Sequence, residues 1–311
     1  MKAFSELRPD WKLSAIVNPE AASQVKDLNV EPVEISESSE ADCYLNFSIA
    51  GLCPSVPEII TIHDLMALNL PGYFGTSMLK NLFAKLIFKS RIKKSIENAS
   101  AISVPTKTTL CDLQSMFTDS GKKAFVTGEG QNLFSRDDTV NSERKDYLLY
   151  VGNARAYKNV TRLIVAYSRL KALNPRFPEM KMVVRRDRAF KDFKRDVEDC
   201  SARDSITILS RVSDDDLRQL YRLCAGLVMP SLKEGFGLPA LEAMAAGCPV
   251  VVSSGTALEE LVGDAGILVN PESVEDIMHG MALLTSQPEL RSRLSERALE
   301  RSQHYSWEKT A

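Results

Sequence analysis

MPSLKEGFGLPALEAMAAGCPVVVS, residues 229–253, is the stretch of the sequence that decides the fold. Residues 225–229 predict a short apolar strand that runs into a polar, glycine-containing loop. Residues 238–246 predict a helix, with Pro239 near its first position, and residues 250–252 predict the next buried strand. The stretch is therefore a strand, loop, helix, strand unit, which is typical of an α/β fold with a parallel sheet.

The loop before the predicted helix is suited to an anionic ligand. A loop that leaves the carboxyl end of a parallel strand and opens a helix presents free amides and the positive helix end. Gly235 and Gly237 let the backbone approach a bulky anion closely. Glu234 and Glu242 flank this loop with seven residues between them, so that one carboxylate reaches the near end of a ligand and the other its far end. A glutamate can accept from both hydroxyls of a ribose, and the pattern therefore predicts a nucleotide diphosphate site.

The sequence EGFGLPALE at residues 234–242, followed by AMAAGCPVV, resembles the donor site of family 4 retaining glycosyltransferases. The resemblance implies the GT-B fold, in which two Rossmann-like α/β domains face each other across a cleft. It implies that Glu242 binds the donor ribose and that Glu234 is a catalytic residue beside the donor sugar. The loop residues that it assigns to donor binding are Gly235, Phe236, Gly237 and Leu238.

Length and composition are those of a globular protein with two domains. The 311 residues allow two cores, and 44% hydrophobic residues with a net charge of −2 argue against nucleic acid as the main partner. No apolar run is long enough for a membrane span, and MKAFSELRPDWK at the start lacks a signal-peptide core, so a cytoplasmic protein is expected. Six scattered cysteines and three histidines show no metal-ligand spacing, so we expect no metal and no other cofactor.

The polar segment SRDDTVNSERKD, residues 135–146, has the composition of a linker. We therefore predict an N-terminal, acceptor-side domain over residues 1–134 and a C-terminal nucleotide-sugar-binding domain over residues 147–311. The resemblance extends from about residue 57 to the end. It implies that the first domain is truncated, lacking the family's usual first strand and glycine loop, and that the helix which crosses back from the carboxyl end is also missing.

Two further positions are predicted to act on the donor. His63 follows an apolar strand at residues 58–62, and a lone histidine is more often a packing or hydrogen-bonding residue than a catalyst. His63-Asp64 nevertheless resembles the family's His-Asp motif, which implies a catalytic position facing the donor sugar. Lys158 precedes a predicted helix, where an ammonium can meet phosphate oxygens, and the resemblance assigns it to the donor diphosphate.

The same loop departs from the family at one position. Many members carry an arginine directly after the strand's glycine, where this chain has Asn153. Either Arg155 takes over that charge at the donor, or the second charge is missing.

Residues 77–98 predict a long helix whose polar side is basic. Leu79, Leu82, Phe83, Leu86, Ile87 and Ile96 are predicted to be its apolar face. A face packed on the core, with solvated lysines opposite, is the first interpretation. Docking of a basic amphipathic helix on an anionic membrane is the second, because it would suit a lipid-linked acceptor at the inner face of the membrane.

The sequence thus predicts a retaining, metal-independent hexosyltransferase. It would move a sugar from a nucleotide diphosphate sugar to the hydroxyl of a carbohydrate or lipid-linked acceptor, in cell-surface polysaccharide or glycolipid synthesis. The resemblance implies reaction on one face of the sugar, with Lys158 and the helix amino end stabilising the leaving phosphate. Two alternatives stay open: a non-catalytic module that binds a nucleotide or a partner, and a GT-B epimerase of nucleotide sugars.

Overall fold

The chain divides into two compact units, Met1–Gly130 with Ser306–Ala311 and Gln131–Tyr305. We predicted that the second domain would include every residue from 147 to 311, whereas the last six residues group with the first unit. The computed structural model describes residues 14–16, 31–33, 43–46, 57–74, 77–120, 123–135 and 144–311.

The described strands of the second unit form one parallel sheet: β7 (Tyr147–Gly152), β8 (Glu179–Val184), β9 (Ile206–Leu209), β10 (Gly226–Met229), β11 (Val250–Ser253) and β12 (Ile267–Val269). Their order across the sheet is β12-β11-β10-β7-β8-β9. The chain builds outward from β7 to β9, then returns to the other side of β7 and continues to β12. The direction of winding therefore reverses between β7 and β10, as in a doubly wound nucleotide-binding fold.

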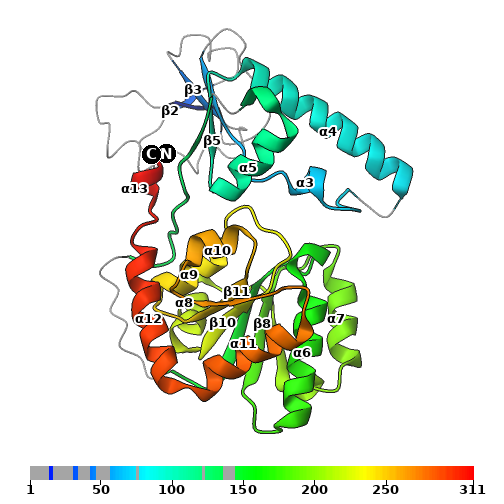
Figure 1. Cartoon of the computed structure of the whole chain (residues 1–311), viewed down its shortest axis with the longest axis vertical. Helices are drawn as coiled ribbons and strands as arrows, with labels where there is room; N and C mark the ends of the chain where they lie inside the picture. The colour runs from blue at the N-terminus through cyan, green and yellow to red at the C-terminus, as the bar shows by residue number, and fades with distance from the viewer. Residues whose placement is uncertain are drawn as a thin grey trace. The chain divides into compact units, whose positions relative to one another are not determined.

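Helices cover both faces of this sheet (Figure 1). The first face carries α6 (Val160–Leu173), α7 (Phe190–Asp199) and α11 (Val274–Ser286); the second carries α8 (Asp214–Leu223), α9 (Leu238–Ala245), α10 (Ala257–Val262) and α12 (Pro288–Ser302). Side chains alternate along each strand: Leu148 and Tyr150 of β7 pack on the first face, and Leu149 and Val151 on the second. Burial on both faces explains why the strands are nearly continuous apolar runs.

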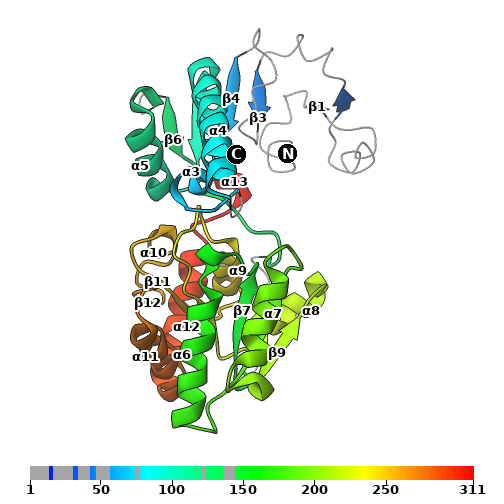
Figure 2. The same ribbon diagram turned by 90° about the vertical axis from the view of Figure 1, so that its right-hand side faces the viewer.

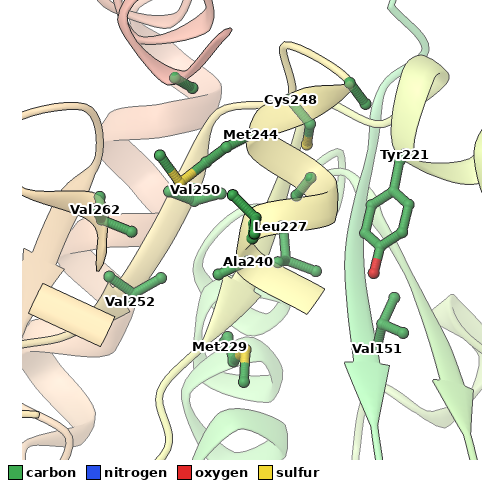
Figure 3. Close-up of a cluster of buried hydrophobic side chains, with 14 of the residues drawn as sticks. Val151, Tyr221, Leu227, Met229, Ala240, Met244, Cys248, Val250, Val252 and Val262 are labelled. Atoms are coloured by element: carbon green, nitrogen blue, oxygen red, sulfur yellow. The ribbon is translucent and has the colours of Figure 1, made fainter. Parts of the chain in front are cut away.

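The core on the second face holds α9 in place. Tyr221 of α8 and Val262 of α10 lie on its two sides, and the strands lie beneath it (Figure 3). Because α9 contributes four buried side chains to this core, the loop that opens it has a fixed position. The contributing residues of α9 are Ala240, Leu241, Ala243 and Met244.

The first unit contains a second parallel sheet, with β3 (Tyr44–Asn46), β4 (Glu58–Thr61), β5 (Ala101–Val104) and β6 (Ala124–Val126) in that order. Figure 2 shows β3 and β4 side by side. A separate parallel pair joins β1 (Ser14–Ile16) and β2 (Glu31–Val33). The absence of the usual first strand stays a prediction, because residues 1–13 and 17–30 lie outside the described part of the chain.

The helices of the first unit are α3 (Met66–Asn69), α4 (Met78–Asn98), α5 (Lys107–Met116) and α13 (Trp307–Thr310). The prediction of which face of α4 packs on the core is wrong. Of the six apolar residues expected on the core side, only Ile96 is buried, while Leu79, Leu82, Phe83, Leu86 and Ile87 are exposed. None of the described helices is both long and apolar enough to cross a bilayer.

The last six residues, Ser306–Ala311, pack tightly within the first unit. A Cβ on Gly130 would lie 2.3 Å from the backbone nitrogen of Trp307, so this contact requires a glycine. Ser306 caps α13 by accepting from the Lys309 amide. A short helix therefore groups with the first unit at the position where the resemblance implied that a crossing helix was missing.

Candidate active site

The loops after β7 and β10 leave the sheet where its winding reverses, and they carry most of the predicted site residues, including Lys158 and Glu234. The Leu232 amide donates to the Tyr157 carbonyl at 2.7 Å, which ties the two loops together. Lys158 ends η4 (Ala156–Lys158), and its Nζ donates to Oε1 of Glu234 at 2.6 Å. Residues that are 76 apart in the sequence are thus brought into direct contact.

This ion pair is buried. The side chains of Lys158 and Glu234 are 9% and 7% exposed, so each charge depends on the other for its neutralisation. Burial, reinforced by the charge of Glu234, raises the pKa of Tyr150 well above its ordinary value. The Tyr150 hydroxyl therefore stays protonated, and it donates to the Asn153 carbonyl at 2.6 Å. The loop after β7 is held by this bond close to the pair.

Asn159 fixes the backbone next to Lys158. It adopts a left-handed conformation with φ of 59°, which asparagine tolerates better than most residues. Its Nδ2 donates to the carbonyls of Pro230 and Pro271 at 2.9 and 2.7 Å. These carbonyls lie just beyond β10 and β12, so one amide group joins three loops at the same edge of the sheet.

The backbone at the amino end of α9 has a conformation that requires a glycine. Gly237 has φ of 113°, and a Cβ there would lie 2.4 Å from Cδ2 of Leu258. The ring of Phe236 is buried, and its centroid lies 5.6 Å from that of the Tyr305 ring in an edge-to-face contact. The backbone of Phe236, and not its ring, is therefore the part that we predict to face the ligand. Gly235 precedes it and Leu238 opens the helix, and their predicted contacts with phosphate and sugar stay predictions.

Glu242 lies one turn into α9 and is held by a tyrosine. The Tyr221 hydroxyl donates to Oε2 of Glu242 at 2.8 Å. Burial raises the pKa of Glu242, against the opposing effect of the Tyr221 hydrogen bond, and the charge of Asp214 adds to the increase. Burial and the neighbouring carboxylate raise the pKa of Tyr221 as well, so it remains a donor. Sequence reasoning missed Tyr221, which belongs to a different helix.

Asn153 and Arg155 shape the loop after β7. Asn153 accepts from the Arg155 amide at 3.0 Å and donates to the Tyr157 hydroxyl at 3.3 Å. Arg155 is exposed, and its Nε lies 3.2 Å from Oδ2 of Asp187. Asp187 also accepts from the Ala189 amide at the start of α7. Whether Arg155 supplies a second charge to the donor stays a prediction.

His63 belongs to the first unit and forms a pair there. Its Nδ1 lies 2.7 Å from Oε1 of Glu129. His63 follows β4 and Glu129 follows β6, so both stand at the carboxyl ends of parallel strands in one sheet. Glu129 is buried while the His63 side chain is 52% exposed, and the carboxylate favours the tautomer with a proton on Nδ1. Sequence reasoning missed Glu129, because the pairing of its loop with the loop after β4 follows from the topology of the sheet.

The fold and the site together define an α/β protein of the GT-B class, with an ion pair and a helix amino end at the reversal of its second sheet. A family model described as "Glycosyl transferases group 1" matches residues 132–301, which is nearly the whole second unit. The chain belongs to this family.

Named relatives are similar over parts of their length. The O-antigen chain mannosyltransferase B of Escherichia coli is 36% identical over 165 residues, which is 52% of this chain and 42% of the relative. The O-antigen chain mannosyltransferase RfbU of Salmonella typhimurium is 26% identical over 239 residues, or 76% of this chain and 64% of the relative. The chain thus spans less than two thirds of either protein.

A solved structure shows the same fold over almost the whole chain. WaaG, described as a glycosyltransferase involved in lipopolysaccharide biosynthesis, superposes with a TM-score of 0.74 at 16% identity. The match covers 97% of this chain and 90% of WaaG. At this identity the likeness establishes the GT-B fold, as the sequence predicted.

Proposed function

We propose that the protein is a retaining, metal-independent hexosyltransferase that transfers a sugar from a nucleotide diphosphate sugar to an acceptor hydroxyl. The observation that carries this proposal is the meeting of Lys158 and Glu234 at 2.6 Å beside the amino end of α9, in a chain of the group 1 family. Synthesis of a cell-surface polysaccharide or glycolipid is the setting, and the names of the two relatives make mannose the first donor sugar to test.

The diphosphate would bind at the start of α9. Free amides at residues 236–238 and the positive helix end attract the phosphates, and the left-handed Gly237 allows close approach. The Lys158 ammonium would turn from Glu234 to a phosphate oxygen. Glu234, released from the ion pair, would then accept from a hydroxyl of the donor sugar. The contact between Lys158 and Glu234 at 2.6 Å supports the assignment of Lys158 to phosphate and of Glu234 to sugar, because it brings an ammonium and a carboxylate together in one buried pair.

The ribose would bind at Glu242. The Tyr221 hydrogen bond holds this carboxylate in one orientation, so its oxygens are positioned before the nucleotide arrives. Glu242 lies inside a helix and next to the ribose, too far along the donor to attack the anomeric carbon. That placement supports a reaction without a covalent glycosyl-enzyme, in contrast to a retaining hydrolase with two catalytic carboxylates.

The chemical step would take place on one face of the sugar. The bond between the anomeric carbon and the phosphate oxygen breaks, and the acceptor oxygen bonds to that carbon on the same face. The acceptor's proton passes to the leaving phosphate oxygen. Lys158 and the start of α9 stabilise the negative charge on that phosphate, which is the role that a divalent cation would otherwise fill. His63, oriented by Glu129, is proposed to contact the donor sugar.

The acceptor is proposed to be a carbohydrate or a lipid-linked carbohydrate. We place the enzyme in the cytoplasm, with peripheral contact of residues 77–98 at the inner face of the membrane, because such contact would bring it to a lipid-linked acceptor.

A donor-turnover assay separates this function from the two alternatives. Nucleoside diphosphates are first screened by thermal shift, and the matching mannose and glucose donors are then incubated with and without an acceptor glycan. Transfer with retained anomeric configuration, undiminished by a chelator, is the expected result. Conversion of the donor without acceptor would identify an epimerase. Nucleotide binding with no conversion under either condition would identify a non-catalytic module.

A further inference from the structure

Two buried thiols meet where α8 and α9 end. Cys224 directly follows α8, Cys248 lies shortly after the end of α9, and their sulfur atoms are 3.1 Å apart. Both residues are fully buried. Figure 3 shows Cys248 in the core on this face of the sheet. The proposed transfer reaction makes no use of these two sulfurs.

Arg144 places a positive charge beside the pair. Its guanidinium donates to the carbonyl of Cys224 at 3.2 Å and to that of Gly247 at 2.5 Å, and Gly247 directly precedes Cys248. Although burial opposes ionisation, the hydrogen bond from the Cys224 thiol and the charge of Arg144 lower the pKa of Cys248. Burial and the neighbouring sulfur raise the pKa of Cys224. The pair thus combines a sulfur that ionises more readily with one that stays protonated, and the thiolate is the reactive form of cysteine.

The segment between the two cysteines contains most of the candidate donor site. It includes β10, the loop with Glu234, and α9 with Glu242. A disulfide has an S–S distance of about 2.05 Å, so the sulfurs would have to approach by only about 1 Å to form one. That bond would close the segment into a ring beyond the carboxyl end of α9, whereas the diphosphate is proposed to bind at the amino end. A ring of this kind restricts the unfolded chain and thereby favours the folded one.

We propose that Cys224 and Cys248 are a redox-sensitive pair, which a small two-electron oxidant such as hydrogen peroxide converts to a disulfide that staples the donor segment. The size of the oxidant follows from the burial of both sulfurs. In a reducing compartment the pair stays as two thiols, so the staple forms under oxidative conditions.

The oxidation takes place in two steps. The Cys248 thiolate attacks one oxygen of the peroxide, the O–O bond breaks, and a sulfenic acid and hydroxide result. The hydroxide takes up the proton that Cys248 released and becomes water. The Cys224 sulfur then attacks the Cys248 sulfur, the S–O bond breaks, and the oxygen leaves as water with the Cys224 proton. Two thiols have then lost two electrons and two protons, and one peroxide has become two molecules of water.

The test counts the thiols of the full chain in the background Cys43→Ser/Cys111→Ser, which removes two exposed cysteines. Reduced protein is freed of reductant, treated with hydrogen peroxide, quenched in acid, unfolded and alkylated. Peroxide should remove two alkylatable thiols from each chain, and dithiothreitol should restore them. Peptide mass spectrometry should identify Cys224 linked to Cys248 of the same chain. Adding Cys200→Ala, the matched control, should leave this result unchanged.

Cys224→Ala and Cys248→Ala should each abolish the reversible loss of thiols. Circular dichroism checks that these variants are folded, and Cys248→Ser is a further variant of the same kind. Thiols that all stay alkylatable after peroxide would overturn the proposal, as would a link from either cysteine to a different one.

Urea unfolding followed by circular dichroism tests the staple itself. The oxidised background protein should unfold at a higher urea concentration than the reduced one, and the alanine variants treated with peroxide should show no such shift. Thermal shift by a nucleoside diphosphate should be the same in both redox states, because the bond forms at the far end of α9. An unchanged urea midpoint in the cross-linked protein, or a thermal shift lost on oxidation alone, would rule out a staple.

Discussion

Three charged groups of the candidate donor site each have a side-chain partner within the protein. Lys158 is paired with Glu234, and Glu242 is held by Tyr221. If Lys158 binds the donor diphosphate as proposed, a phosphate would compete with Glu234 for the ammonium. Because the ion pair is buried, removal of one partner also leaves the charge of the other partner buried without compensation, and this destabilises the fold. Substitutions at this pair need a stability measurement beside each affinity measurement.

Replacement of Lys158 should separate these two effects. Lys158→Met is expected to weaken the binding of a nucleoside diphosphate far more than that of the nucleoside, since a charge-assisted hydrogen bond contributes about 1.5–3 kcal/mol. It should also lower the free energy of unfolding by about 3–5 kcal/mol, because Glu234 is left unpaired. Calorimetric binding and urea unfolding measure the two quantities. The double variant Lys158→Met/Glu234→Gln should recover stability but not diphosphate affinity. Equal losses for nucleoside and diphosphate would place Lys158 away from the phosphates.

The two glutamates should differ in what they bind. Glu242→Ala is expected to lose most of the affinity for a nucleoside diphosphate, because the ribose hydroxyls lose a charged acceptor, at about 1.5–3 kcal/mol for each bond. Glu234→Gln should raise that affinity, because Glu234 no longer competes for the Lys158 ammonium, and should lower turnover, since its proposed partner is the sugar. Titration calorimetry and initial rates measured on both variants test this division. It fails if Glu242→Ala binds as the wild type does.

Glu242 should also give binding a distinctive pH dependence. Burial raises the pKa of this carboxyl above its ordinary value, and protonation removes the charged acceptor for the ribose. Affinity for a nucleotide diphosphate sugar should therefore decline on acidification at a pH above the ordinary glutamate pKa of about 4.3. Such a donor has no phosphate proton that titrates near pH 6, so the ligand contributes little to the profile. Glu242→Gln should show a nearly flat profile, and identical profiles for the two proteins would refute the assignment.

Helices α8 and α9 end next to one another and share a single capping arginine. Nη1 of Arg144 donates to the carbonyls of Arg222 and Cys224 at 3.0 and 3.2 Å, after α8. Nη2 donates to the Gly247 carbonyl at 2.5 Å, after α9. A guanidinium at two helix carboxyl ends satisfies carbonyls that the helices leave free and opposes both dipoles. The residue thereby supports the two helices that carry Tyr221 and Glu242.

Loss of this cap should destabilise the second unit without touching the ligand. Arg144→Met is expected to lower the free energy of unfolding by about 3 kcal/mol, because several partly buried carbonyls lose a charged donor. Urea unfolding measures the change, and exposed Arg188→Met is the control that should shift it little. Nucleotide affinity of the folded variant should stay near that of the wild type. An unchanged unfolding midpoint would mean that water replaces the cap at no cost.

Arg144 also shows where sequence reasoning reached its limit. The sequence predicts a strand at residues 225–229 and a helix at residues 238–246, each within one residue of the bounds of β10 and α9. These features depend on neighbouring residues. Arg144 lies in a segment predicted as a linker, and its acceptors are 78 to 103 residues away, so no local pattern could reveal its role.

The helix α4 and the candidate site illustrate the same limit. The periodicity of its apolar residues predicts that α4 is a helix. Because the helix has two apolar faces, the periodicity does not tell which of them packs on the core. The loop that opens α9 was predictable in structure because its residues form one contiguous motif between a strand and a helix. The partners Tyr221, Asp187 and Glu129 lie on other elements and required the topology of the sheets.

The two units have separate hydrophobic cores. Ile60, Ile92 and Leu113 belong to the core of the first unit, while the two cores of the second unit lie on either side of its sheet. A core of its own allows each unit to unfold as a separate cooperative step. The second unit, Gln131–Tyr305, contains no tryptophan in its sequence, and Trp307 belongs to the first unit. Tryptophan fluorescence therefore reports on that unit alone, whereas far-ultraviolet circular dichroism reports on both.

This distribution of tryptophans allows the location of nucleotide binding to be tested on the intact chain. A nucleoside diphosphate at about a hundred times its dissociation constant should stabilise the second unit by about 2.7 kcal/mol. In urea, circular dichroism should show the unfolding of the second unit at a higher denaturant concentration when the nucleotide is present. The fluorescence transition, which reports the unfolding of the first unit, should not move. Glu242→Ala should abolish the shift. A fluorescence transition that moves by the same amount would show that the nucleotide stabilises both units together, because they then unfold as one.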